Sequence, residues 1–218
     1  MTTLSAFYHS SIGKKLIVGL TGVCLCIYLV VHLGGNLLLF KNDGGAAFDR
    51  YAELLPSLLI ILIVEKILFA IFICHIVFGV IVWTINKFSR PQKYLVNKPQ
   101  ENSSFSSRWA FVTGSIVFIF LVIHIRTFWF TSRYQAGEHF SMYALVKESF
   151  SSPLYSSFYI VAMALLGFHL RHGFQSVFQT FGLKTTKYTP LIEAVGIIFW
   201  LLIPIGFAII PIYFFLNS

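Results

Sequence analysis

The sequence predicts an all-α integral membrane protein in which residues 1–218 form one bundle of five transmembrane helices. Composition gives the first indication, because the chain is 57% hydrophobic and 11% charged, with a mean hydropathy of +0.79. Such values are typical of membrane proteins and rare in soluble domains. The second indication is five separate apolar runs, each near the roughly 20 residues that a spanning helix needs. The third is that ionisable residues recur inside these runs, with at least one histidine in each of the first four.

The five spans are expected over residues of about 16–40, 57–86, 109–131, 155–181 and 191–215. The first run follows Lys14 and Lys15 and is longer than the 7–15-residue apolar region of a signal peptide, so we expect it to be retained. Polar connections are expected at 41–56, 87–108 and 132–154. Gly182 is a suitable stop for the fourth helix, and the prolines of the fifth are tolerated in membrane helices.

The distribution of positive charge predicts the orientation. Five spans place the two termini on opposite sides. Lys and Arg are enriched in cytoplasmic connections, and nine such residues would lie on the N-terminal side: Lys14, Lys15, Lys87, Arg90, Lys93, Lys98, Arg108, Lys184 and Lys187. Four would lie on the other: Lys41, Arg50, Arg133 and Lys147. We therefore expect a multi-pass protein of the inner or cytoplasmic membrane, with the N-terminus inside, the C-terminus outside and a basic inner face that suits docking of a soluble partner.

Several classes of function are disfavoured. The net charge of +8 could indicate nucleic-acid binding in a soluble protein, but membrane topology explains these basic residues better. The three cysteines, Cys24, Cys26 and Cys74, lie inside apolar runs and match neither a disulfide framework nor an iron–sulfur site. No soluble segment is long enough to bind a flavin or a nucleotide, and no internal repeat is expected.

Histidines carry the chemistry. Ionisable groups inside a membrane are costly, so they usually face the bundle interior and serve a ligand, a path or an ion. A lone buried histidine is more often a hydrogen-bonded core residue. Four of them on four spans, however, indicate axial ligands for the irons of two haems, each held between a pair of helices. These four are His32, His75, His124 and His169.

Depth predicts the pairing, since a helix rises about 1.5 Å per residue. His32 and His124 each precede a basic residue of the outer connections by nine positions, roughly 13 Å. His75 and His169 lie roughly 24–28 Å below the prolines that open their helices. One iron needs both imidazoles at one level, so His32 should pair with His124 near the outer face and His75 with His169 near the inner face.

His172 competes with His169, because it lies one turn further on a similar face. Gly79 follows His75 by four residues and Gly173 follows His169 by four, and such a glycine removes bulk where a porphyrin must lie. This spacing favours His169 as the ligand. His172 and Arg171 then become candidates for haem propionate or quinone contacts.

Other polar residues of the spans leave alternatives open. Arg126 is a candidate propionate partner of the outer haem or an interfacial anchor. Glu65 and Lys66 suit a face turned to a partner or the interface, with Lys66 snorkelling, or a role in proton or quinone chemistry. The quinone could bind near the outer haem, by Asn36, Asp49 or Glu53, or near the inner haem, by Arg171 or His172.

These residues resemble a known family, the single-polypeptide dihaem cytochrome b anchor of succinate:quinone oxidoreductase and quinol:fumarate reductase, or respiratory complex II. The resemblance covers nearly the whole chain and rests on VVHLGGN, ICHIVFG, LVIHIR and FHLRHGFQSVFQTFG in the first four spans. The family's four axial ligands would fall on His32, His75, His124 and His169. Its fourth ligand precedes a helix-end glycine by thirteen residues, as His169 precedes Gly182.

The resemblance implies two haem b cofactors and a quinone, menaquinone, as electron acceptor. A flavoprotein subunit would oxidise succinate, and an iron–sulfur subunit on the inner face would pass electrons to this anchor, which would not act on succinate itself. In one respect the sequence departs from some fumarate reductases, which have a glutamate two residues before the fourth ligand, tied to proton transfer. Here that residue is Gly167, which puts such a route in doubt.

Two alternatives remain open. One is the dihaem subunit of another respiratory enzyme, such as quinol:fumarate reductase, a hydrogenase or formate dehydrogenase. The other is a haem-free transporter or structural anchor whose histidines form a proton path.

Overall fold

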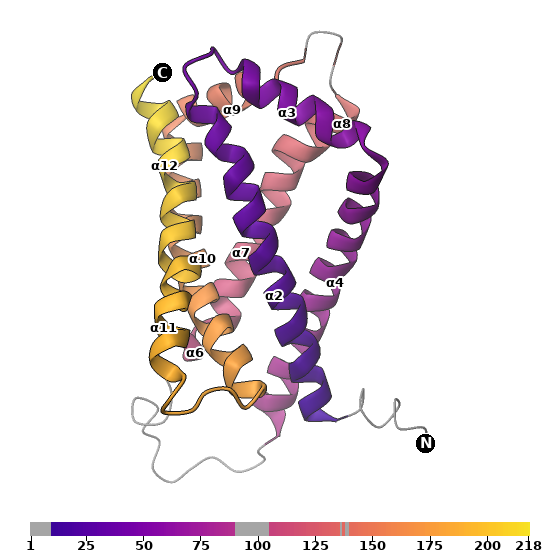
Figure 1. Cartoon of the computed structure of the whole chain (residues 1–218), viewed down its shortest axis with the longest axis vertical. Coiled ribbons are helices and arrows are strands. Elements are labelled where there is room, and N and C mark those ends of the chain that lie inside the picture. Colours follow the sequence, from indigo (N-terminus) through magenta and orange to yellow (C-terminus); the bar gives the residue numbers. More distant parts are fainter. Residues whose placement is uncertain (1–9, 90–104, 136, 138–139) are drawn as a thin grey trace.

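The computed structural model describes residues 10–89, 105–135, 137 and 140–218, and in these residues all regular structure is helical, without a strand. Five helical segments are long and apolar enough to cross a membrane. They run side by side in one bundle, with α3 and α9 lying across one end (Figure 1). This confirms the predicted all-α fold with five helical segments that are long and apolar enough to span a membrane. We call the end where α2 begins the inner end and the other the outer end, after the predicted orientation.

Each predicted span corresponds to one segment. The first, Ser11–Phe40, joins α2 (Ser11–Asn36) to the 3₁₀ helix η1 (Leu37–Phe40). The second is α4 (Leu59–Phe88). The third, Ala110–Tyr134, follows α6 (Phe105–Arg108) and comprises α7 (Ala110–His124), the π-helical η2 (Ile125–Phe130) and α8 (Thr131–Tyr134). The fourth is α10 (Pro153–Thr180), and the fifth, Thr189–Leu216, comprises α11 (Thr189–Ile197), the π-helical η3 (Ile198–Leu202) and α12 (Ile203–Leu216).

Capping residues extend the helices beyond their apolar runs. Helix α2 begins at Ser11 rather than near residue 16, because the Ser10 hydroxyl accepts a hydrogen bond from Gly13 N at 2.9 Å. Helix α10 begins at Pro153, where the ring suits the first turn, and Ser152 caps it. It ends at Thr180, and Gly182, the predicted stop, follows the cap residue Phe181 with a φ of +71°, the left-handed conformation that glycine adopts easily.

Two predicted connections contain helices instead: α3 (Ala46–Ser57) lies within 41–56 and extends one residue beyond it, and α9 (Met142–Ser151) lies within 132–154. Polar side chains satisfy their ends. The Asp43 carboxylate accepts hydrogen bonds from Gly45 N and Ala47 N, both at 3.0 Å. The Asp49 carboxylate accepts from the Ser141 hydroxyl at 2.6 Å and from Tyr143 N at 2.8 Å, which ties α3 to α9. These connections therefore form a covering layer at the outer end.

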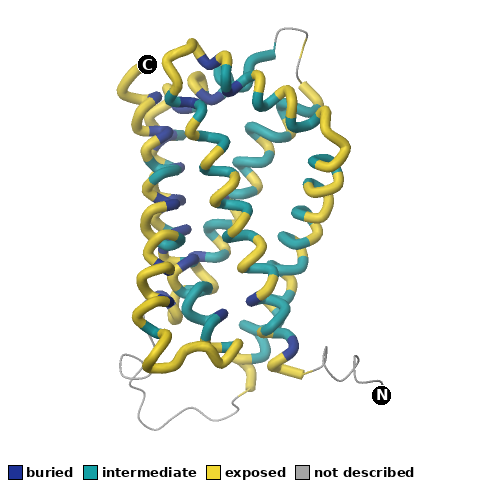
Figure 2. The backbone as a smooth tube through the Cα atoms, in the orientation of Figure 1, coloured by how far each residue is buried: buried dark blue, intermediate teal, exposed yellow. Residues whose placement is uncertain are grey.

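The buried core lies around α10, which contributes Tyr159, Ala162, Met163, Leu166 and Leu170 to one cluster with residues of α7, α9 and α12. In contrast, α4 contains no buried residue and packs mainly against α2. Figure 2 shows the same difference, with buried positions gathered along α10 and α12, whereas the positions of α4 are intermediate or exposed. The apolar surface of α4 suits contact with lipid.

Candidate functional site

The four histidines form two pairs. The rings of His32 (α2) and His124 (α7) have centroids 5.8 Å apart and planes at 88°. Those of His75 (α4) and His169 (α10) have centroids 6.4 Å apart and planes at 80°. Each pair joins two different helices, and the predicted pairing as haem ligands requires this proximity of the rings.

The spacing of both pairs suits bis-imidazole ligation of one iron. Two axial metal–nitrogen bonds of about 2 Å each, together with two ring radii, place the ring centroids roughly 6 Å apart. Imidazoles in direct hydrogen bonding could also be this close, but no hydrogen bond joins the described members of either pair. The chemistry of the donors fits as well, because a pair of histidines is a common axial set for b-type haem.

Thr21 on α2 lies within hydrogen-bond distance of His75. Its Oγ1 atom lies 3.1 Å from His75 Nδ1, and its hydroxyl donates to the carbonyls of Ile17 at 2.7 Å and Val18 at 3.0 Å. A hydroxyl has one proton to donate. When that proton is given to a helix carbonyl, Thr21 Oγ1 is an acceptor for Nδ1–H. His75 Nε2 is then the unprotonated nitrogen, which is the form that binds a metal.

Glycines allow two of the imidazoles to approach a neighbouring helix. A Cβ atom at Gly22 would lie 3.3 Å from His75 Cε1, and one at Gly114 would lie 3.0 Å from His169 Cε1. His169 Nδ1 is buried in this contact without a hydrogen-bond partner in the described part of the chain. The inner pair therefore has similar backbone supports on α2 and α7 but different polar partners.

The outer pair has an aromatic environment. His124 Nδ1 lies 3.2 Å from the hydroxyl of Tyr159, which lies 3.0 Å from the hydroxyl of Tyr155. Tyr159 is 5% exposed, so this pair of hydroxyls is part of the core. The ring of His32 stacks on Tyr28, with centroids 5.3 Å apart and an interplanar angle of 14°. A buried phenol beside Nδ1 can orient the imidazole of an axial ligand.

The first and third spans contain a local repeat that includes the residues beside the histidines. Residues 21–32, TGVCLCIYLVVH, and residues 113–124, TGSIVFIFLVIH, are identical at six of twelve positions. In each segment, a Thr-Gly pair near the inner histidines precedes an outer histidine, and the ten residues from Gly to His correspond to roughly 15 Å of helix. The expectation of no internal repeat is therefore wrong for these two spans. Self-comparison of the apolar runs would have found the signal.

Gly79 and Gly173, the glycines expected to leave room for a porphyrin, lie in open positions. A Cβ atom at Gly79 or at Gly173 would meet no atom within 4 Å, so neither glycine is required by packing within the described residues. This is consistent with the expected role of leaving room beside His75 and His169. At Gly167 a Cβ atom would lie 2.8 Å from the carbonyl oxygen of Trp200, so the backbone of η3 leaves no room for a larger side chain at this position without a shift.

Arg126 and Arg171, the predicted propionate or quinone contacts, lie beside aromatic rings. The Arg126 guanidinium lies 4.7 Å from the centroid of the Phe130 ring, and that of Arg171 lies 5.2 Å from the centroid of the Trp200 ring. Both arginines are exposed, and neither makes a contact with the four imidazoles among the described residues. His172, which is partly buried, forms no ring pair with His75; His169 does.

Glu65 joins two helices near the outer end. Its carboxylate accepts hydrogen bonds from Arg133 at 2.8 Å and from the Trp129 indole at 3.1 Å, both on the third span. The side chain of Glu65 is 16% exposed, whereas that of Lys66, 3.0 Å away, is 71% exposed. The two residues therefore differ: Lys66 is a surface residue, and Glu65 has an interior partner that sequence alone did not indicate.

Two of the three candidate quinone contacts of the outer side make hydrogen bonds within the protein. Asn36 Nδ2 donates to the backbone oxygen of His32 at 2.8 Å. Asp49 uses both carboxylate oxygens to hold the start of α9. Glu53 is exposed on α3.

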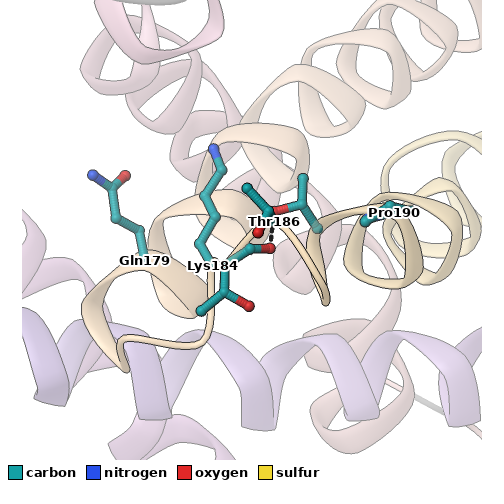
Figure 3. A pocket seen from close by; sticks show the side chains of 6 residues that line it. Gln179, Lys184, Thr186 and Pro190 are labelled. Atoms are coloured by element: carbon teal, nitrogen blue, oxygen red, sulfur yellow. Dashed lines mark hydrogen bonds between the residues drawn. The ribbon is translucent and has the colours of Figure 1, made fainter.

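At the inner end, the turn between α10 and α11 forms an open cleft of about 580 Å³ (Figure 3). It is lined by Gln179, Lys184, Thr185, Thr186, Thr189 and Pro190. Gln179 lies ten residues beyond His169, roughly 15 Å along the helix, so this cleft is separate from the imidazole pairs.

Arg90, Lys93 and Lys98 of the predicted docking surface lie outside the described residues. No cluster of three or more His, Cys, Asp or Glu suited to a metal ion occurs in the described part of the chain.

Comparison with known proteins gives one informative match. Over 166 residues, the chain is 31% identical to the succinate dehydrogenase cytochrome b558 subunit of Bacillus subtilis (strain 168). The match covers 73% of this chain and 74% of that protein. No family model and no solved structure matches the chain. The similarity extends over most of both chains, and on this basis the protein belongs to the family of succinate dehydrogenase cytochrome b membrane subunits.

Proposed function

We propose that this chain anchors a succinate:quinone oxidoreductase in the membrane and conducts electrons through two b-type haems to a quinone, with menaquinone as the expected acceptor. The observation that carries the proposal is the presence of two imidazole pairs, from four helices, at two levels of one membrane bundle. Membership of the succinate dehydrogenase cytochrome b family supports it.

In the proposed complex, His32 and His124 hold the outer haem, and His75 and His169 hold the inner haem. When bound, each haem supplies a one-electron redox centre within the bilayer. The chain orients the axial imidazoles through Thr21 and Tyr159, and its apolar helices keep water away from them. The levels of the two pairs, roughly 15 Å apart along α2 and α7, would place the two centres in series across the membrane.

The soluble partners supply what this chain lacks. A flavoprotein subunit would oxidise succinate, and an iron–sulfur subunit would dock on the inner face, where the predicted orientation concentrates positive charge. Electrons would then enter at the inner haem and leave for the quinone. Because the chain belongs to a succinate dehydrogenase family, this arrangement is favoured over the cytochrome subunits of hydrogenase or formate dehydrogenase.

Two measurements test the proposal. The purified chain should give a reduced-minus-oxidised spectrum with a b-type alpha band and two haems per polypeptide by pyridine haemochrome. The native complex, purified through this subunit, should reduce a menaquinone analogue with succinate as donor, and a complex lacking this chain should retain succinate oxidation with a soluble dye only. Absence of the alpha band would refute the haem assignment and favour a haem-free anchor.

A further inference from the structure

The four histidines differ in the group that faces Nδ1. His75 Nδ1 has the hydroxyl of Thr21, and His124 Nδ1 has that of Tyr159. His169 Nδ1 is buried without a partner in the described residues. Within the inner pair, only the imidazole of His75 therefore faces a side-chain hydroxyl.

Thr113 on α7 is the residue to compare with Thr21 on α2. It occupies the same place in the repeated segment as Thr21, followed by the glycine that supports His169. Its hydroxyl also donates to two carbonyls of its own helix, those of Trp109 at 3.0 Å and Ala110 at 3.1 Å. Thr113 nevertheless has no hydrogen bond to an imidazole in the described structure. Two equivalent threonines thus share one local role, and Thr21 alone has the additional contact.

We propose that Thr21 is a positioning residue for the inner haem, whose hydroxyl accepts the Nδ1 proton of His75 and holds that ligand in the form with a free Nε2. This inference rests on the proposed function, since it assigns His75 to an iron. A group that accepts a hydrogen bond from Nδ1–H makes an axial imidazole more basic. A more basic ligand stabilises the oxidised iron, so Thr21 lowers the midpoint potential of the inner haem and leaves the outer haem unaffected.

The experiment uses four single variants of the full chain: Thr21→Val, Thr21→Ser, Thr113→Val and Tyr159→Phe. Valine keeps the shape of threonine and removes the hydroxyl, whereas serine restores it. Thr113→Val controls for loss of the same hydroxyl-to-backbone contact at the equivalent place. Tyr159→Phe removes a hydroxyl from the outer pair. Haem content is measured by pyridine haemochrome, and the potential of each centre by redox titration followed optically and by electron paramagnetic resonance.

Thr21→Val should keep two haems and raise the midpoint potential of one centre, the one that His75→Ala removes. The expected change in its reduction equilibrium is about threefold to tenfold, a tenfold change being about 59 mV for one electron. Thr21→Ser and Thr113→Val should leave both potentials near those of the original chain. Tyr159→Phe should move only the other centre.

The remaining outcomes separate this inference from the proposed function. If the original chain binds no haem, both are overturned. If two haems are bound and Thr21→Val moves neither potential, or moves one only as far as Thr113→Val does, the role of Thr21 alone is overturned. Loss of the inner haem in Thr21→Val supports the role if Thr21→Ser retains it, and contradicts the role if serine loses it too.

Discussion

Substituting Gly114 by alanine tests the support of His169 most sharply, because one methyl group enters a measured contact. A Cβ atom there would lie 3.0 Å from His169 Cε1 and 3.3 Å from Nδ1. Ordinary contacts of this kind begin near 3.4 Å, so the imidazole must move by a few tenths of an ångström. Gly22 has the same relation to His75 at 3.3 Å, whereas a Cβ atom at Gly19 would make an ordinary contact of 3.5 Å with Val177.

Two opposing terms give the magnitude. Replacing glycine by alanine within a helix stabilises it by about 1 kcal/mol. Forcing a methyl group into a packed interior costs about 1–3 kcal/mol. Gly19→Ala should therefore be neutral or slightly stabilising, whereas Gly114→Ala should be less stable than Gly19→Ala by about 1–3 kcal/mol. Gly22→Ala should lie between them.

The displaced ligand should also weaken haem retention. Disturbing a residue that orients a metal ligand typically costs about tenfold to a hundredfold in affinity. The assay is thermal unfolding in detergent together with haem loss to apomyoglobin, and only the inner haem should dissociate faster in Gly114→Ala. If Gly114→Ala and Gly19→Ala were alike in stability and in haem loss, the close approach of Gly114 to His169 would not be needed to hold the inner haem.

Three further predictions follow. Glu65→Gln should lower the free energy of unfolding in detergent by about 1–3 kcal/mol, because the charge-assisted bond to Arg133 is weakened. Lys66→Gln should change it by less than about 1 kcal/mol. Equal effects would contradict the distinction between a partly buried Glu65 and a surface Lys66. Gly79→Ala should not destabilise the chain in its haem-free form, but the purified variant should contain less haem. Unchanged haem content would show that no porphyrin lies beside Gly79. Charge reversal at Lys93 and Lys98 should weaken retention of the soluble subunits at moderate salt, and unchanged retention would mean that these lysines set topology only.

Much of the fold followed from sequence because the membrane imposes a simple requirement. An apolar run of about 20 residues must satisfy its backbone internally, so it forms a helix. The level of each histidine in the bundle was also accessible, since position along a helix converts directly to depth, and the pairing of the histidines as ligands stays a prediction. His32 and His124 could be matched without knowing any side-chain contact.

The remainder depends on contacts between helices, which spacing does not define. From sequence alone, Thr21 is an ordinary threonine of a membrane helix, and only the structure shows that it lies beside His75. In the same way, only the structure shows that Glu65 is bonded to Arg133. The helices of the outer layer were missed because Gly44 and Gly45 indicate a turn, while the carboxylates that stabilise α3 and α9 act only once the chain is folded. Arg126 and Arg171 suggested anion contacts, but their aromatic neighbours are defined by three-dimensional packing.

The pairing of the ligands is tested most directly by redox titration of the haem that remains in four variants: His32→Ala, His75→Ala, His124→Ala and His169→Ala. Each should retain one haem per polypeptide, which also shows that the bundle has formed. The His32 and His124 variants should share one remaining centre, and the His75 and His169 variants should share the other, while His172→Ala keeps both. Loss of the same centre in the His32 and His75 variants would contradict the pairing, and loss of a haem in His172→Ala with both retained in His169→Ala would move the fourth ligand to His172.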